Sequence, residues 1–155
     1  MSDSALNPEM ICQVGFIVRD IESTAQRFSE VFGLPRPNIH VTPGHEIAET
    51  TYQGEPSDAT AKLAFFNTGQ VQIELIEPDE KPSVWRDFLE QHGEGVHHIA
   101  FQVPDTKMAT NHLAKSGIGI CQQGLYSDRS GIYTYMDSTP ALGMMIELLE
   151  TFSRK

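Results

Sequence analysis

The stretch Gly-Val-His-His-Ile-Ala-Phe-Gln-Val-Pro-Asp at residues 95–105 decides how the rest of the chain is interpreted. From His98 onward, large apolar residues alternate with small or polar ones, which predicts a β-strand with one apolar face. Strict alternation also predicts that His97 and His98 point to opposite faces. An imidazole at the start of a rigid strand suits a metal site. A His-His pair alone is weak evidence, so the metal hypothesis depends on what the rest of the chain places beside it.

The chain contains two stretches twice, at equivalent places. Residues 13–20, Gln-Val-Gly-Phe-Ile-Val-Arg-Asp, match residues 98–105 at an offset of 85 positions. Residues 72–77, Gln-Ile-Glu-Leu-Ile-Glu, match residues 145–150 at an offset of 73. The offsets differ because the first half has a longer middle, rich in proline and glycine, over residues 34–58. Two copies of this size indicate two modules related by a pseudo-twofold axis.

Each half is expected to contain a strand, a helix and about three further strands. The first half suggests a strand at 11–18, a helix at 21–32 stopped by Gly33, short strands at 39–42 and 47–52, and a hairpin of 61–67 with 71–76. A linking helix is expected at 83–91. The second half suggests a strand from 95, a helix at 106–116, strands at 118–122, around 133–135 and at 143–150, and a turn at 137–140.

These elements predict an α+β fold: two tandem βαβββ modules forming a curved, partly open mixed sheet around a metal cleft. The expected organisation is a flexible tail over residues 1–9, a first module over 10–78, a linker with a short helix over 79–95 and a second module over 96–151. Together the modules form one domain.

Composition limits the function. The chain has 155 residues, 39% of them apolar, and no apolar run long enough for a membrane span. No secretory signal is visible, so we expect a cytoplasmic protein without membrane contact. A formal charge of −10 repels phosphate backbones, which argues against nucleic acid and favours small-molecule ligands. Two cysteines without a CxxC motif suggest free thiols, so a metal would take nitrogen and oxygen ligands.

A pseudo-twofold axis would bring Gln13 to His98 and Glu74 to Glu147 across one cleft. Each glutamate lies in an apolar strand, where an unpaired carboxylate would be costly and a divalent cation would satisfy it. In the alternative interpretation both glutamates belong to the solvent face of half-exposed strands. That alternative does not explain why the repeat places a glutamine and a histidine at matching positions of the first strands.

The chain resembles the vicinal oxygen chelate superfamily, which includes glyoxalase I, methylmalonyl-CoA epimerase, extradiol dioxygenases and bleomycin-resistance proteins. The resemblance covers about residues 10–151 and is carried by the stretches at 13–20, 71–78, 93–101 and 142–149. It implies one divalent metal ion, zinc, nickel, cobalt or manganese, with Gln13, Glu74, His98 and Glu147 as ligands. The stretch at 93–101 is most similar to the epimerase branch. The ligand set is similar to one form of glyoxalase I.

The resemblance implies a metal-dependent isomerase, epimerase or lyase that abstracts a proton next to a carbonyl through a metal-stabilised enolate. Glu147 is the expected base, and Tyr133 and Tyr135 are expected to line the substrate cleft. Epimerases of this family carry an additional glutamate in the first module, where this chain offers Glu46, Glu49 and Glu55. The expected substrate is a small molecule such as an acyl-CoA or a glutathione adduct, and we expect a homodimer.

Two other functions are open to a chain of this kind. One is a metal-free small-molecule binding protein of the bleomycin-resistance type, which sequesters a cationic drug and with which the negative charge is compatible. The other is an extradiol-type dioxygenase, which needs two histidines and one carboxylate on Fe(II). Gln13 stands where the first of those histidines belongs, which argues against the dioxygenase.

Overall fold

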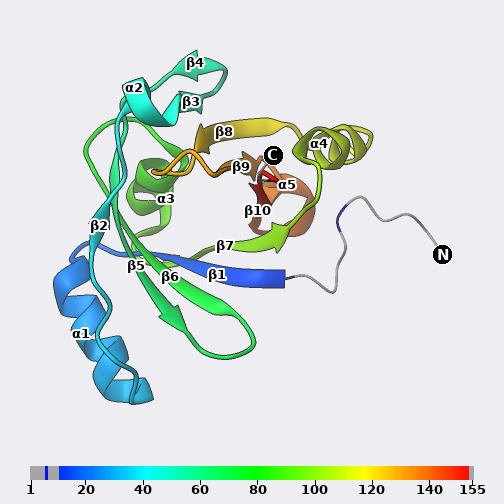
Figure 1. The fold of residues 1–155 in the computed structure, drawn as a ribbon. Helices are drawn as coiled ribbons and strands as arrows, with labels where there is room; N and C mark the ends of the chain where they lie inside the picture. The colour runs from blue at the N-terminus through cyan, green and yellow to red at the C-terminus, as the bar shows by residue number, and fades with distance from the viewer. Residues whose placement is uncertain (1–5, 7–10, 154–155) are drawn as a thin grey trace.

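The computed structural model describes Leu6 and residues 11–153 of the chain. The tail expected over residues 1–9 therefore lies outside the described residues, apart from Leu6. Within the described residues, ten strands form one mixed sheet in the order β2-β5-β6-β1-β7-β10-β9-β8-β3-β4. The sheet curls into an open half-barrel with helices on its outside and at one end (Figure 1). The predicted α+β fold with a curved, partly open sheet is confirmed.

The strands are Ile11–Ile17 (β1), His40–Val41 (β2), Thr51–Tyr52 (β3), Glu55–Pro56 (β4), Ala61–Asn67 (β5), Gln72–Pro78 (β6), Gly95–Gln102 (β7), Ile120–Leu125 (β8), Gly131–Met136 (β9) and Met145–Thr151 (β10). The helices are Ile21–Phe32 (α1), His45–Ala48 (α2), Val84–His92 (α3), Thr106–Ala114 (α4) and Thr139–Leu142 (α5). The turn expected at 137–140 is wrong for its second half, because residues 139 and 140 belong to the short helix α5.

The strand register reproduces the sequence repeat. In the first half β1 runs parallel to β6, and Gly15 lies opposite Glu74. In the second half β7 runs parallel to β10, and Ala100 lies opposite Glu147. These two pairs are related by the offsets of 85 and 73 found in the sequence. Each glutamate is thereby held in a central strand beside the first strand of its own half.

The two halves meet where β1 pairs antiparallel with β7. Gln13 lies opposite Ala100 and Gly15 lies opposite His98. At the offset of 85, Gln13 corresponds to His98 and Gly15 corresponds to Ala100. The two pairs are therefore equivalent, as a twofold relation requires. Gln13 and His98 therefore lie on adjacent strands at the middle of the sheet.

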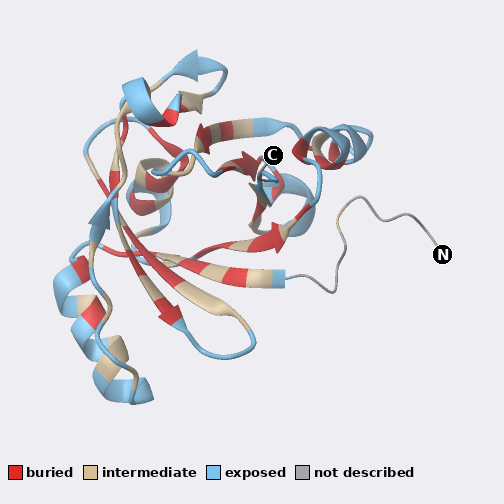
Figure 2. Cartoon of the chain, in the orientation of Figure 1, coloured by how far each residue is buried: buried red, intermediate tan, exposed pale blue. Residues whose placement is uncertain are grey.

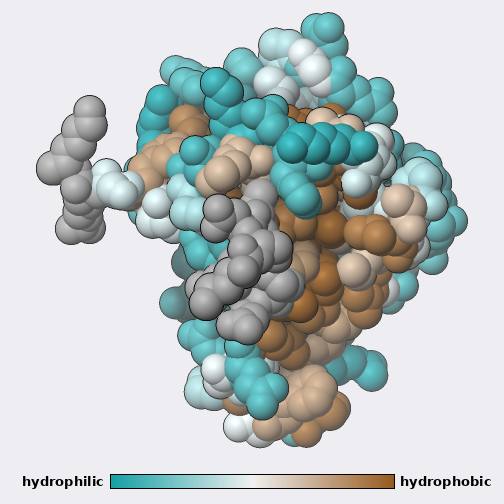
Figure 3. Space-filling model, turned by 90° about the vertical axis from the view of Figure 1, so that its right-hand side faces the viewer, coloured by the Kyte–Doolittle hydropathy of each residue, from teal (hydrophilic) through white to brown (hydrophobic). Residues whose placement is uncertain are grey.

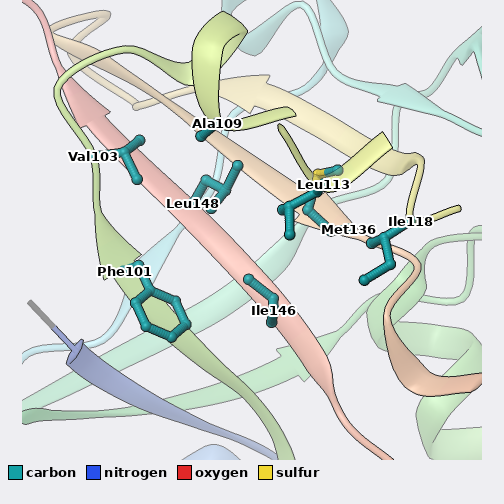
Figure 4. Close-up of a cluster of buried hydrophobic side chains, with 8 residues drawn as sticks. All are labelled: Phe101, Val103, Ala109, Leu113, Ile118, Met136, Ile146 and Leu148. Carbon is teal, nitrogen blue, oxygen red and sulfur yellow. The ribbon is translucent and has the colours of Figure 1, made fainter. Parts of the chain in front are cut away.

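The helices begin where the sequence places acidic caps. Asp20 accepts a hydrogen bond from the Ser23 backbone N–H at the start of α1, and Asp105 does the same for Met108 at α4. Helix α4 covers one end of the sheet over an apolar cluster (Figure 4) made of Phe101, Val103, Ala109, Leu113, Ile118, Met136, Ile146 and Leu148. The outer sides of α1 and α4 are exposed, whereas the strands beneath carry most of the buried residues (Figure 2).

The prediction of a strand over residues 47–52 is wrong for the first part of this range. Residues 45–48 form α2 instead, and the His45 backbone N–H donates to Asp58 Oδ1 at 2.9 Å. Only Thr51–Tyr52 is a strand, and it pairs with β8 of the second half. Because β8 would otherwise leave a row of unpaired backbone groups, the long middle of the first half crosses over and covers this edge.

The surface is uneven in character. The side of the molecule at the right of Figure 1 carries a continuous apolar band bordered by hydrophilic residues (Figure 3). Among the described residues, no helix combines the length and the apolar character that a membrane crossing needs.

Candidate metal centre

The four residues singled out by the repeat converge inside the half-barrel. Gln13, Glu74, His98 and Glu147 stand on four adjacent strands, β1, β6, β7 and β10. Their exposed fractions are 5%, 6%, 0% and 4%. Glu74, His98 and Glu147 offer ligand atoms that all lie within 4.8 Å of one another, close enough to hold a metal ion.

The distances define a compact centre. His98 Nε2 lies 2.9 Å from Glu147 Oε2, 3.4 Å from Glu74 Oε2 and 3.0 Å from Gln13 Oε1. The inward amide atom of Gln13 also lies 3.1 Å from each of these two carboxylate oxygens. Three oxygens and one imidazole nitrogen therefore face a common point.

The orientation of Gln13 depends on Gln72. Gln13 Nε2 donates to Gln72 Oε1 at 2.8 Å, which leaves Gln13 Oε1 facing the carboxylates. Turning the Gln13 amide over would direct its N–H groups at Glu74 and Glu147 but place its oxygen against Gln72 Oε1. With the Gln13 amide in this orientation, three oxygens of Gln13, Glu74 and Glu147 face His98 Nε2, and a divalent cation or a proton on His98 would satisfy them. The donor set thus fits a metal ion.

Charge in the centre supports the same conclusion. Burial alone would lower the pKa of His98, but the charges of Glu147 and Glu74 and their hydrogen bonds raise this pKa to about 9. Burial raises the pKa of Glu74, and the charge of Glu147 raises it further. The two buried carboxylates therefore demand a positive charge, which a proton on His98 or a divalent ion can supply.

His97 is held beside the centre by a β-bulge. Gly15 lies opposite His98 and Phe16 lies opposite Val96, so β7 has one extra residue, His97, at this point. His97 Nδ1 lies 3.0 Å from His98 Nδ1. The prediction from strict alternation, that His97 faces away from its neighbour, is therefore wrong.

The contact between the two histidines orients His98. Burial and the neighbouring His98 lower the pKa of His97 well below its ordinary value, so His97 is neutral and its Nδ1 can accept a hydrogen bond. With His98 Nε2 turned toward the carboxylates, its Nδ1–H is the group that donates. Such a partner on the outer nitrogen is what fixes the ring of a metal-ligating histidine.

Gly15 leaves the space that the His98 ring occupies. A Cβ atom at residue 15 would lie 2.0 Å from His98 Cε1 and 2.6 Å from His98 Nε2. These distances are far below van der Waals contact, so no side chain fits at this position. The equivalent residue in the second half, Ala100, carries a methyl group.

A cavity of about 790 Å³ opens onto the centre and is lined by Gln13, Glu74 and Glu147. The predicted residues Tyr133 and Tyr135 both line it. Tyr135 is 2% exposed, and its hydroxyl oxygen accepts a hydrogen bond from Trp85 Nε1 at 3.0 Å. Tyr133 Oη lies 3.5 Å from Thr50 Oγ1, where the crossing segment of the first half meets the second half.

The additional glutamate sought in the first half is not brought to the cavity. Glu46, Glu49 and Glu55 are all exposed, and none of them lines the cavity. Glu49 instead accepts from Arg129 Nη2 at 3.1 Å. Trp85, Thr50 and Gln72 do line it. Trp85 lies in the linker and Thr50 in the insertion, so both are outside the repeat. Gln72 lies within the repeat, but its counterpart is Met145. The repeat therefore did not predict that these three residues line the cavity.

Solved structures with a similar fold include two methylmalonyl-CoA epimerases. The enzyme of Mycobacterium tuberculosis is 21% identical, with a TM-score of 0.69, over 99% of this chain and 93% of that chain. A variant of the Streptomyces coelicolor enzyme in complex with 2-nitronate-propionyl-CoA is 21% identical, with a TM-score of 0.64, over 93% of this chain and 98% of that chain.

A curated relative is the uncharacterized protein YqjC of Bacillus subtilis (strain 168), which is 44% identical over 50 residues. That match spans 32% of this chain and 36% of the relative, or about a third of each. A family model described as glyoxalase/bleomycin resistance protein/dioxygenase superfamily matches residues 12–135. Since this match runs from β1 into β9 and takes in most of the sheet, the chain belongs to the glyoxalase/bleomycin resistance protein/dioxygenase superfamily.

Proposed function

We propose that this protein is a metal-dependent enzyme that removes a proton from a carbon next to a carbonyl, as an isomerase, an epimerase or a lyase. The observation that carries the proposal is the convergence of Gln13, Glu74, His98 and Glu147 on one buried point at the wall of a cavity. Two buried carboxylates held this close together are expensive unless a positive charge joins them, and a divalent cation supplies it.

These four residues would hold the ion. One imidazole and three oxygen donors suit nickel, cobalt, manganese or zinc. When bound, a divalent ion supplies a positive charge that polarises a carbonyl oxygen and makes the neighbouring C–H group more acidic. Gln72 and His97 would orient two of the ligands, Gln13 and His98, through the hydrogen bonds described above.

Glu147 is the proposed base. Its side chain lines the cavity, and Tyr135 of the aromatic wall lies opposite it in the register of β9 and β10. A carboxylate held there can take a proton from a substrate carbon and return it to another position or another face. The Streptomyces coelicolor epimerase, which has a similar fold, holds 2-nitronate-propionyl-CoA in its complex.

The test is deuterium exchange in D₂O, followed by NMR on metal-loaded protein with α-branched acyl thioesters, hemithioacetals, hydroxyketones and simple 2-oxo acids. We expect deuterium to enter the carbon next to the carbonyl of at least one compound. Glu147→Gln keeps an oxygen ligand but removes the base, so its exchange rate should fall by about 10²- to 10⁴-fold.

Glu46→Gln is the matched control, since it makes the same change at an exposed carboxylate outside the cavity. Its rate should equal that of the wild type. If no compound exchanges, or if Glu147→Gln exchanges as fast as the wild type, the proton-transfer role of Glu147 is wrong. Metal-free small-molecule binding would then become the leading hypothesis.

A further inference from the structure

We propose that the substrate of this site is an uncharged small molecule: a hydroxyketone or dicarbonyl compound with an aromatic or alkyl group and no phosphate or carboxylate. The inference rests on the proposed proton transfer next to a carbonyl and narrows its substrate class. Three features of the cavity carry it: the absence of lysine and arginine from the described residues of its lining, the charge balance of the centre and the chemistry of the wall.

Among the described residues that line the cavity, none is Lys or Arg. Arg129 lies in the loop at the rim, between two lining residues, but its guanidinium is already engaged. Arg129 Nη1 donates to the Ile47 carbonyl oxygen at 3.0 Å, and Nη2 donates to Glu49 Oε1 at 3.1 Å. Phosphate and carboxylate groups are held mainly by Arg and Lys side chains. The cavity therefore lacks the usual partners of an anionic ligand.

The charges of the metal-loaded centre would already balance, so an anionic ligand would find no excess positive charge to pair with. Two carboxylates, Glu74 and Glu147, face the site, and they would balance the two positive charges of a divalent ion. Asp128 adds a further acidic residue to the lining. The described residues of the lining include one histidine, His40. An anionic group brought into this surrounding would lose its hydration without gaining a counter-charge.

The wall offers partners for an uncharged molecule instead. Trp85, Tyr133 and Tyr135 form an aromatic cluster with ring centroids 6.1 Å, 6.1 Å and 5.7 Å apart. Thr50 and Ser127, which carry hydroxyl groups, belong to the same lining. Aromatic walls with a few convergent hydroxyls bind apolar groups and neutral oxygens. This chemistry differs from that needed for coenzyme A, which carries several phosphate charges.

A matched pair of probes tests the inference: phenacyl alcohol, an uncharged aryl hydroxyketone, and phenacyl phosphate, its phosphate ester. Binding to the metal-loaded protein is measured by calorimetry, with coenzyme A as a competitor. We expect phenacyl alcohol to bind at least about tenfold more tightly than the phosphate. Coenzyme A should not displace it.

A charge variant checks the cause of this preference. Ser127→Lys places an ammonium group at the rim and should remove or reverse the preference. Ser116→Lys adds the same charge at an exposed position that does not line the cavity, and should leave the preference unchanged. An unchanged preference in Ser127→Lys would overturn the charge argument.

Tighter binding of phenacyl phosphate or coenzyme A by the wild type would overturn the inference, as would failure of both phenacyl probes to bind at millimolar concentration. Binding and exchange are separate measurements. Tight binding of phenacyl alcohol without deuterium exchange contradicts the proton transfer but supports the substrate class. Exchange of an acyl-CoA bound more tightly than the uncharged probe contradicts the substrate class alone.

Discussion

Gly15 determines whether the His98 imidazole can occupy the centre. Gly15→Ala would place a methyl carbon 2.0 Å from His98 Cε1, so the ring must move away from both carboxylates. We expect the affinity for Ni²⁺ to fall at least about tenfold, as measured by calorimetry. Gly119→Ala is the matched control, because a Cβ there has no atom within 4 Å. Equal Ni²⁺ affinity in both variants would contradict the role given to Gly15.

The pKa of His98 predicts a pH dependence of the metal-free protein. Burial opposes protonation, but Glu147 and Glu74 raise the pKa from 6.5 to about 9 in the folded state. Because the folded-state value is the higher one, this stabilisation is fully present below pH 6.5 and is lost as the pH rises through about 9. The free energy of unfolding should fall by on the order of 3 kcal/mol over that range.

Urea unfolding of chelator-treated protein at the two ends of this pH window measures the difference. In Glu147→Gln the largest charge that raises the His98 pKa is gone, so the fall in unfolding free energy should shrink. Saturating metal should also reduce it, because the ion then replaces the proton. A wild-type stability that stays constant or rises over the window would contradict this account of the centre.

At the residue scale, the repeat in the sequence predicts which side chains meet. Gln13 matches His98 and Glu74 matches Glu147, and the structure places all four together. His97 could not be predicted correctly, because a bulge depends on how β1 and β7 pair and leaves no mark in the alternation of one strand. Gln72 was missed because its counterpart is Met145, which has no polar group.

At the scale of elements, the segment between β2 and β5 joins the two halves. β3 comes from the first half but pairs with β8 of the second, and Thr50 just before it reaches Tyr133 at the cavity. The sequence indicated the insertion through its prolines and glycines. It could not indicate the partner strand, because a two-residue strand carries too little pattern to specify a pairing.

Tyr52 anchors this crossing strand to α3. Its hydroxyl donates to Asp87 Oδ2 on the helix. Tyr52→Phe removes the hydroxyl and should lower the free energy of unfolding by about 1 kcal/mol, without changing the affinity for Ni²⁺. Asp87→Asn keeps an oxygen acceptor and should cost less. A Tyr52→Phe variant that loses metal affinity would show that the crossing strand supports the centre as well as the cavity wall.

At the scale of the whole molecule, the curl of the sheet turns a sequence repeat into a site. The adjacent strands β6, β1, β7 and β10 each contribute one polar side chain to the centre inside the half-barrel. Helices lie on the outside of the sheet and at one end (Figure 1). Neither half alone supplies more than two of the four groups. The homodimer expected from the sequence stays a prediction.

The central claim is that these four residues bind one divalent ion, and metal analysis by inductively coupled plasma mass spectrometry tests it most directly. Protein is loaded with Ni²⁺ or Mn²⁺, dialysed against metal-free buffer and assayed for metal per chain. We predict one ion per chain in the wild type and none in the double variant Glu74→Ala, Glu147→Ala. The control Glu46→Ala, Glu55→Ala changes two exposed carboxylates and should keep its ion. A wild-type protein without retained metal, or equal metal in the wild type and the Glu74, Glu147 double variant, would contradict the claim.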